Sequence, residues 1–299
     1  MARTRRTTGS RMPSCEGSRL VPRCLTIAGS DSGGGAGIQA DLKAFAAAGC
    51  HGTSVIVALT AQNTVGVKAV HEVPPAFVRA QLDAVFADIG VDSAKTGMLF
   101  SRELIETVAD FLHAHRVPLV VDPVMLASSG AKLLQDDAVD SLAEQLFPLA
   151  TVVTPNLHEA RALVAQSHKA SVGGSQRHSE DQVAQSHKGL GRRDLAAAIH
   201  ELGAPAVIVT GGHGDEAVDH LFDGERHVEI PVRRYDVRAT HGAGCTHSAT
   251  LAAHLARGSS VEDSARAAAL AASEAVRHGL GELGSGEGPV DVLNVKGAA

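Results

Sequence analysis

Short apolar runs alternate with stretches of helical spacing along most of this chain, and this alternation restricts its possible folds most strongly. The sequence predicts buried strands at 25–28, 54–59, 117–121, 151–153 and 206–210, and helices at 38–48, 76–89, 101–115, 136–147, 156–165 and 192–202. Strand-helix-strand units of this kind form parallel sheets with helices on both faces. We therefore predict an α/β fold with a mostly parallel central sheet, while 64–72 and 216–237 favour β-hairpins at its margin.

Polar or glycine-rich groups follow many of the predicted strands. They are Gly29-Ser30-Asp31, Gln62-Asn63, Lys95-Thr96-Gly97-Met98, Asp122-Pro123, Thr154-Pro155-Asn156 and Thr210-Gly211-Gly212. In open α/β sheets, ligands bind at the carboxyl ends of the strands. We therefore expect these groups to gather around one ligand site.

The segment Thr240-His241-Gly242-Ala243-Gly244-Cys245-Thr246 precedes an apolar run at 249–256 that has helical character. Its small residues allow the backbone N–H groups of Gly242, Ala243, Gly244 and Cys245 to converge at a helix N-terminus, which is an arrangement that binds phosphate. The helix dipole would also lower the pKa of the Cys245 thiol, which predicts a thiolate acting as a base or stabilising charge. A glycine-rich turn with a small buried cysteine is the alternative.

Asp122 and Glu159 are acidic residues at a predicted strand end and a predicted helix start. Carboxylate oxygens in such positions suit Mg²⁺, bound directly or through water. Asn156 stands three residues before Glu159 and would face the same side of the helix. Glu159 could equally be a helix-capping acid. The chain has neither a G-x-x-x-x-G-K-[ST] motif nor a G-x-G-x-x-G motif, so phosphate binding must use another scheme.

Charge and cysteine content restrict the setting in which this chain works. The 299 residues carry a formal net charge of −6, which predicts no binding to nucleic acid or anionic membranes. Residues 1–23 are rich in arginine and lack the apolar region of a signal peptide, so we interpret them as a flexible tail before one domain at 24–292. The four cysteines form no C-x-x-C pair, which favours a reducing cytoplasm.

One stretch interrupts the regular pattern. The six residues Val164-Ala165-Gln166-Ser167-His168-Lys169 recur unchanged at 183–188, with a polar spacer between the two copies. Two polar copies are too few for a repeat architecture. We therefore predict a duplicated surface loop inserted at about 166–190.

Taken together, the chain resembles the hydroxymethylpyrimidine/phosphomethylpyrimidine kinases of thiamine biosynthesis, which have the ribokinase-like fold. The matching segments are 28–43, 61–64, 95–99, 122–125, 154–159 and 241–246. The resemblance covers roughly 24–292 apart from the insert. It implies a three-layer sandwich that uses ATP and Mg²⁺ to phosphorylate 4-amino-5-hydroxymethyl-2-methylpyrimidine and then its monophosphate. A homodimer is also implied.

The resemblance further implies a role for each matching residue. Gln62 would read the pyrimidine edge, since an amide can donate and accept in one plane; a simple loop residue is the alternative. The resemblance places the Gly29 backbone and Asp41 at the border of the pyrimidine pocket, with Met98 and Val124 packed on the ring. It places Asn156, Thr210 and Gly212 at the nucleotide and Asp122 and Glu159 at the metal. The reacting phosphoryl group would lie at Gly242, Ala243, Gly244 and Cys245.

One residue departs from the family pattern. Thr210 stands where the resembling enzymes usually have lysine, so a positive charge expected near the nucleotide phosphates is missing. Two other functions therefore remain open. One is a pyridoxine or pyridoxal kinase on the same scaffold, and the other is a catalytically weak pyrimidine-binding protein.

Overall fold

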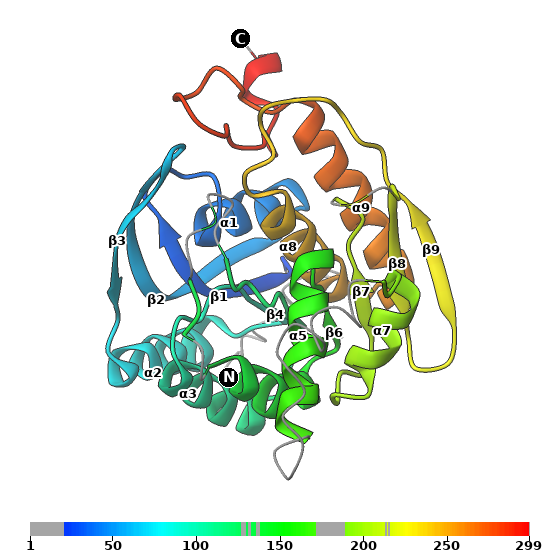
Figure 1. The fold of residues 1–299 in the computed structure, drawn as a ribbon. Coiled ribbons are helices and arrows are strands. Elements are labelled where there is room, and N and C mark those ends of the chain that lie inside the picture. The colour runs from blue at the N-terminus through cyan, green and yellow to red at the C-terminus, as the bar shows by residue number, and fades with distance from the viewer. Residues whose placement is uncertain are drawn as a thin grey trace, which may run out of the picture.

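One β-sheet runs through the part of the chain described by this computed structural model, which covers residues 21–126, 130, 133–135, 138–171, 189–212, 214 and 216–298 (Figure 1). The strand order is β3-β2-β1-β4-β5-β6-β7-β8-β9. The strands are β1 (Arg23–Asp31), β2 (His51–Asn63), β3 (Gly66–Glu72), β4 (Ser93–Thr96), β5 (Leu119–Val121), β6 (Val152–Val153), β7 (Val207–Val209), β8 (Val218–Phe222) and β9 (His227–Pro231).

The pairing of the strands confirms the predicted topology. The central strands β2, β1, β4, β5, β6 and β7 are parallel to one another. At one edge β3 folds back antiparallel on β2, and at the other β8 and β9 continue the sheet in antiparallel fashion. Both hairpin segments predicted from the sequence therefore form the margins of the sheet.

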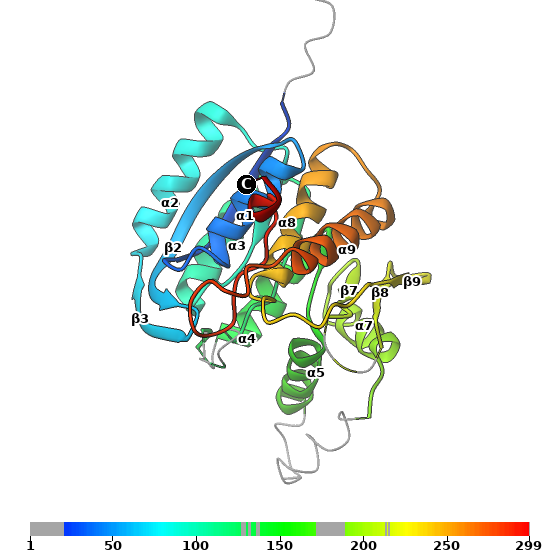
Figure 2. The same ribbon diagram turned by 90° about the horizontal axis from the view of Figure 1, so that it is seen from above.

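Helices cover both faces of the sheet (Figure 2). They are α1 (Gly37–Ala47), α2 (Pro75–Ala84), α3 (Arg102–Ala114), α4 (Ala138–Ser141), α5 (Leu157–Ser171), α7 (Arg192–His200), α8 (Ala243–Ala256) and α9 (Val261–Arg277), with π-helical turns at Val85–Ile89 and Leu142–Leu146 and 3₁₀ turns at Phe147–Leu149 and Val295–Ala298. The larger apolar core lies between the sheet and α2, α3, α5 and α7. A second core joins the opposite face to α1, α8 and α9.

Neighbouring strand residues point to opposite cores, as the pleat requires. Val121 and Val153 belong to the larger core, whereas Val120 and Val152 belong to the core under α8 and α9. All four side chains are fully buried. This explains why the central strands are short uninterrupted apolar runs, the sequence pattern of a parallel sheet covered on both sides.

Several strands are longer than the sequence indicated. Gly29-Ser30-Asp31 lies inside β1, Gln62-Asn63 inside β2 and Lys95-Thr96 inside β4, where we had expected residues beyond the strand ends. Strand β1 continues through a bulge between Ala28 and Gly29. The sequence signal ended early because the added residues are polar or glycine, although backbone pairing continues through them.

The boundaries at two predicted flexible segments also differ. Arg23, which we had assigned to the tail, begins β1, and its guanidinium Nε donates to Asp92 Oδ2 at 3.0 Å. Helix α5 extends to Ser171, so the first copy of the duplicated segment is helical rather than part of a loop. No proline or glycine interrupts the helix there. The second copy, at 183–188, lies outside the described residues.

Within the described ranges, no helix is both long enough and apolar enough to cross a membrane.

Candidate active site

The candidate site lies where the carboxyl ends of the parallel strands meet the N-terminus of α8. This helix packs against β1, β4 and β5. Its Ser248 Oγ donates to Asp122 Oδ2, just beyond β5, at 2.8 Å. The structure thus brings the last predicted motif of the chain to the strand ends, as expected for an α/β sheet.

Glycine at position 242 is required by the geometry of the α8 start. Gly242 has φ of +87°, and a Cβ there would lie 1.8 Å from the carbonyl oxygen of Gly35. No side chain caps the helix. Among the described residues, the N–H groups of Gly242, Gly244 and Cys245 have no acceptor. These three donors, the N–H cradle, are therefore available to an anion at the helix N-terminus.

Ala243 departs from the predicted cradle. Its N–H donates to the carbonyl oxygen of Thr240 at 3.1 Å. That hydrogen bond closes the tight turn into the helix, so this N–H faces the preceding backbone. We therefore remove Ala243 from the set of anion donors.

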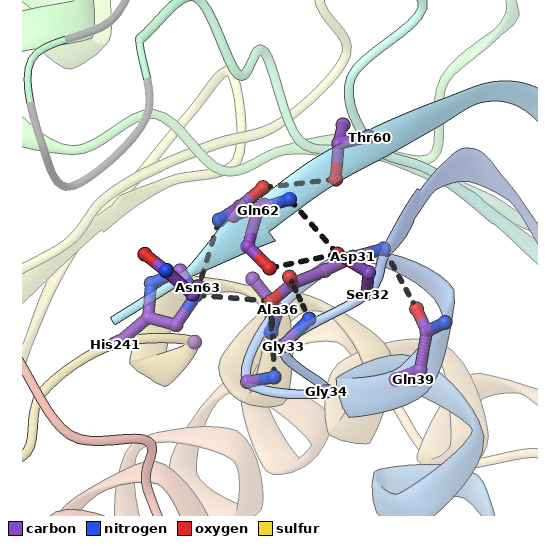
Figure 3. Close-up of polar contacts among 12 residues, drawn as sticks. Asp31, Ser32, Gly33, Gly34, Ala36, Gln39, Thr60, Gln62, Asn63 and His241 are labelled. Carbon is purple, nitrogen blue, oxygen red and sulfur yellow. Dashed lines mark hydrogen bonds and ion pairs between the residues drawn. The ribbon is translucent and has the colours of Figure 1, made fainter. Parts of the chain in front are cut away.

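Asp31 organises the glycine-rich loop that lies against the start of α8 (Figure 3). Its carboxylate accepts the N–H groups of Gly33 at 2.8 Å, Gly35 at 3.0 Å and Ala36 at 2.9 Å. It also lies 3.1 Å from His241 Nε2. Although burial opposes ionisation, the hydrogen bonds from His241 and from the loop N–H groups hold the pKa of Asp31 below its ordinary value.

Gln62 lies beside this acid-histidine pair, as Figure 3 shows. Its amide Nε2 is 3.4 Å from His241 Nε2, and its Oε1 accepts from Thr60 Oγ1 at 3.2 Å. Because the Asp31 carboxylate can only accept, His241 Nε2 carries a proton and cannot accept from the amide as well. The Gln62 amide therefore keeps donor capacity for a ligand.

The Asp31–His241 contact was missed at the sequence level, where both residues counted only as parts of longer motifs. A local signal existed for Asp31, since an aspartate before glycines commonly accepts the N–H two residues later. Nothing local pointed to His241, which is 210 positions away.

An apolar wall completes the predicted pyrimidine pocket. Met98 packs with Ala58 and Leu133, and Val124 packs against this small cluster. Gly29 lies directly against Met98, since a Cβ on Gly29 would be 2.6 Å from Met98 Cε. The structure thus brings Gly29, Met98 and Val124 together, as the sequence comparison implied.

Asp41 lies beneath the pocket and does not line it. It has no exposed surface, and both carboxylate oxygens bond Lys95 Nζ, at 3.0 and 3.1 Å. Thr26 Oγ1 donates to it as well, at 2.6 Å. A buried carboxylate needs such partners to offset its lost hydration. We therefore assign Asp41 to support of the pocket instead of contact with the ligand.

Asn156 and Glu159 form a reciprocal cap at the start of α5. Asn156 Oδ1 accepts the N–H groups of His158 and Glu159 at 2.9 and 3.0 Å, and Glu159 Oε2 accepts the N–H of Asn156 at 2.9 Å. This is a capping box, the alternative that the sequence left open for Glu159. Asn156 also forms a β-bridge with Thr210, so the expected neighbours of the nucleotide lie together.

Asp122 and Glu159 offer oxygen ligands in a buried setting, where Lys95 Nζ lies 3.6 Å from Asp122 Oδ2. Burial first, and repulsion from Asp122 second, raise the pKa of Glu159 to about 8. A divalent cation would relieve both effects. In the described part of the chain, no cluster of three or more His, Cys, Asp or Glu residues is arranged to hold a metal. The donor set therefore fits Mg²⁺, which keeps several waters and needs only one or two carboxylates.

The helix position of Cys245 predicted a lowered thiol pKa, whereas the surroundings of this thiol in the structure raise it. Burial raises the pKa of the thiol to about 12. Lys95 and the Gly37 N–H lower it, but Asp41 and Asp122 raise it further. The sequence argument counted only the dipole of the cysteine's own helix and could not include acids from other elements.

Alkylation should report this protonation state. We expect iodoacetamide to modify Cys245 slowly at neutral pH, with a rate rising about tenfold per pH unit into the alkaline range, because the thiolate is the nucleophile. Mass spectrometry of the Cys245 peptide distinguishes this thiol from the other three cysteines, and Cys245→Ser provides the blank. A rate that levels off between weakly acidic and neutral pH would restore the thiolate assignment.

Comparison with known proteins agrees with the geometry of the site. The family model described as phosphomethylpyrimidine kinase matches residues 31–291. A hydroxymethylpyrimidine/phosphomethylpyrimidine kinase of Rhizobium meliloti (strain 1021) is 47% identical over 274 residues, which cover 89% of this chain and 95% of that protein.

Two solved structures resemble the fold over most of its length. A phosphomethylpyrimidine kinase from Clostridium difficile 630 has a TM-score of 0.67 at 37% identity, covering 85% of this chain and 99% of that one. An ADP complex of Bacillus subtilis pyridoxal kinase has a TM-score of 0.76 at 35% identity, covering 93% and 99%. These likenesses confirm the predicted ribokinase-like fold.

Proposed function

The chain belongs to the phosphomethylpyrimidine kinase family, and we propose that it phosphorylates 4-amino-5-hydroxymethyl-2-methylpyrimidine and then its monophosphate with ATP. One observation carries the proposal. The Asp31–His241 pair connects the Gln62 amide with the N–H cradle that starts at Gly242. A pyrimidine read by Gln62 would thus lie next to a built phosphate site.

The reaction asks for positioning more than for covalent chemistry. The hydroxymethyl oxygen forms a bond to the γ-phosphorus, the bond from that phosphorus to the β–γ bridging oxygen breaks, and ADP leaves. A loose transition state makes small demands on a base, so the hydroxyl proton can leave late, to an oxygen of the transferred phosphoryl group or to water. The N–H groups of Gly242, Gly244 and Cys245 stabilise the charge on the transferred group. A neutral Cys245 thiol lies beside this cradle.

Mg²⁺ would be held by Asp122, with Glu159 through water, and would neutralise phosphate charge when bound. Ser248 and Lys95 orient the Asp122 carboxylate, at 2.8 and 3.6 Å from its Oδ2. The nucleotide lies along Asn156, Thr210 and Gly212. Here the Gly212 position is open, with no described residue within 4 Å of a Cβ built on it.

Substitution of Gln62 by alanine should weaken use of the pyrimidine. We expect kcat/KM for the pyrimidine to fall by about 5- to 150-fold, which corresponds to about 1–3 kcal/mol for leaving polar groups of the ligand unpaired. The Kd for ATP should stay near the wild-type value because Gln62 lies on the pyrimidine side. Steady-state kinetics with each substrate varied in turn will measure both. An unchanged pyrimidine kcat/KM would place the pocket elsewhere.

The decisive experiment is a mass-spectrometric product profile with ATP, Mg²⁺ and the free pyrimidine. Formation of the monophosphate and then the diphosphate supports both steps. Pyridoxal in a parallel reaction tests the second candidate, which the likeness to the Bacillus subtilis pyridoxal kinase favours. Binding of the pyrimidine without turnover of either alcohol would instead indicate the catalytically weak binding protein.

We further place the enzyme in the cytoplasm as a homodimer whose partners are the small pyrimidine substrate and ATP, with no nucleic acid or membrane partner. The cysteines of the described residues, Cys24, Cys50 and Cys245, are free thiols, in keeping with a reducing compartment. Light scattering on the purified protein gives the oligomeric state.

A further inference from the structure

Asp219 and His247 form a buried pair apart from the contacts described above. The side chain of Asp219, on β8, is 3% exposed, and that of His247, on α8, is 5% exposed. His247 Nε2 lies 3.0 Å from Asp219 Oδ2, while Asp219 Oδ1 accepts the N–H of Gly211. One carboxylate therefore ties the turn after β7 to the helix that begins with the phosphate cradle.

The chemistry of the Asp219–His247 pair determines which ring nitrogen of His247 carries the proton. The carboxylate can only accept, so His247 Nε2 donates to it. Nδ1 of the same ring is buried and has no hydrogen-bond partner in the described part of the chain. Asp219 is thus the polar anchor of His247 there, and removal of the carboxylate would leave two buried N–H groups without an acceptor, one on Gly211 and one on His247.

The Asp219 carboxylate also helps to fix the backbone of the turn at 210–212. The carbonyl oxygen of Gly211 accepts from Arg234 Nε at 3.0 Å, so both peptide groups of Gly211 are held. A Cβ on Gly211 would lie 2.5 Å from the backbone of Val218, which keeps the turn pressed against the start of β8. Gly212 follows with its N–H free of any acceptor among the described residues.

We propose that Asp219 is a positioning residue for the nucleotide, which fixes the turn at Gly211–Gly212 and the start of α8 relative to each other so that both contact one polyphosphate. The inference rests on the proposed function, which puts the nucleotide at Thr210 and Gly212. It also explains how this turn serves a nucleotide without a lysine at position 210. The turn supplies an oriented backbone donor where a cation is missing.

The test is calorimetry of two ligands on Asp219→Ala. We expect the Kd for the non-hydrolysable ATP analogue AMP-PCP, with Mg²⁺, to rise about 10- to 100-fold, the usual effect of unpaired buried polar groups. The Kd for the free pyrimidine should not change, because the carboxylate of Asp219 bonds Gly211 and His247 and, among the described residues, no residue assigned to the pyrimidine pocket. An unchanged Kd for AMP-PCP, or equal losses for both ligands, would overturn the proposal.

Asp219→Asn is the conservative control. Its Oδ1 can still accept from Gly211, and its amide can donate to His247 Nε2 once the ring proton moves to Nδ1. Because Nδ1 is buried without a partner among the described residues, we expect this variant to restore the nucleotide affinity in part. If Asp219→Ala proves insoluble, His247→Gln and His247→Leu decide, since glutamine can donate to Asp219 and leucine cannot. Weaker AMP-PCP binding in the leucine variant alone supports the proposal, and equal binding in both overturns it.

The binding assay needs no turnover, so it remains informative if the proposed function fails. A wild-type protein that binds AMP-PCP but phosphorylates no pyrimidine would contradict the function and leave the comparison of Asp219 variants intact.

Discussion

Replacement of Gly242 by alanine should lower kcat by about 10²- to 10³-fold, the usual consequence of losing a pre-organised donor to the transferred group. An alanine Cβ would meet the Gly35 carbonyl oxygen at 1.8 Å, and φ of +87° is unfavourable for any side chain. The start of α8 must then move away from the glycine loop. Because Asp31 and His241 join that loop to the pocket, the cradle and the bound alcohol would lose their alignment.

Gly258→Ala is the matched control. Gly258 also has a positive φ, of +83°, but a Cβ there has nothing within 4 Å. The Gly258→Ala variant therefore measures the cost of a side chain at positive φ, with no steric clash and no change to the N–H groups at the start of α8. We expect its kcat to match wild type after correction for folded fraction, measured by thermal unfolding. A folded Gly242→Ala enzyme with wild-type kcat would show that the cradle does not take part in the reaction.

The fold was predictable because its signals are local. The run at 117–121 indicated a strand buried on both faces, and Val120 and Val121 indeed point into opposite cores. Strand ends were less predictable. Gln62 pairs with Val67 across the hairpin, but a polar residue at a strand end gives no apolar signal.

The candidate site was predictable in its residues and less so in their chemistry. The motifs identified Gly242 and Cys245, but the ionisation of Cys245 depends on burial and on Asp41 and Asp122, which reach it only through the tertiary fold. Asp219 belongs to no predicted motif, and its contacts with Gly211 and His247 likewise arise only in the tertiary fold. Long-range electrostatics of this kind cannot be read from spacing along the chain.

Substitution of Lys95 by methionine should lower the free energy of unfolding by about 3–5 kcal/mol, the range for breaking a buried ion pair. Lys95 has no exposed surface and lies 3.0 Å from Asp41 and 3.6 Å from Asp122. Although burial opposes the charge, attraction to Asp41 and Asp122 raises the pKa of this ammonium above its ordinary value. Methionine fills a similar volume but leaves two acids without their cation. Urea denaturation of the ligand-free protein will measure the loss.

Two comparisons separate charge from packing. Arg266→Met breaks an ion pair with Glu262 whose side chains are 47% and 34% exposed, and should cost less than about 1 kcal/mol. The double variant Lys95→Met/Asp41→Asn should recover part of the stability, because one uncompensated charge disappears with its partner. A loss below about 1 kcal/mol for Lys95→Met alone would mean that Asp41 and Asp122 are already neutral. In that case the two acids would no longer add to the effect of burial on the Cys245 pKa, and the alkylation profile would shift toward lower pH.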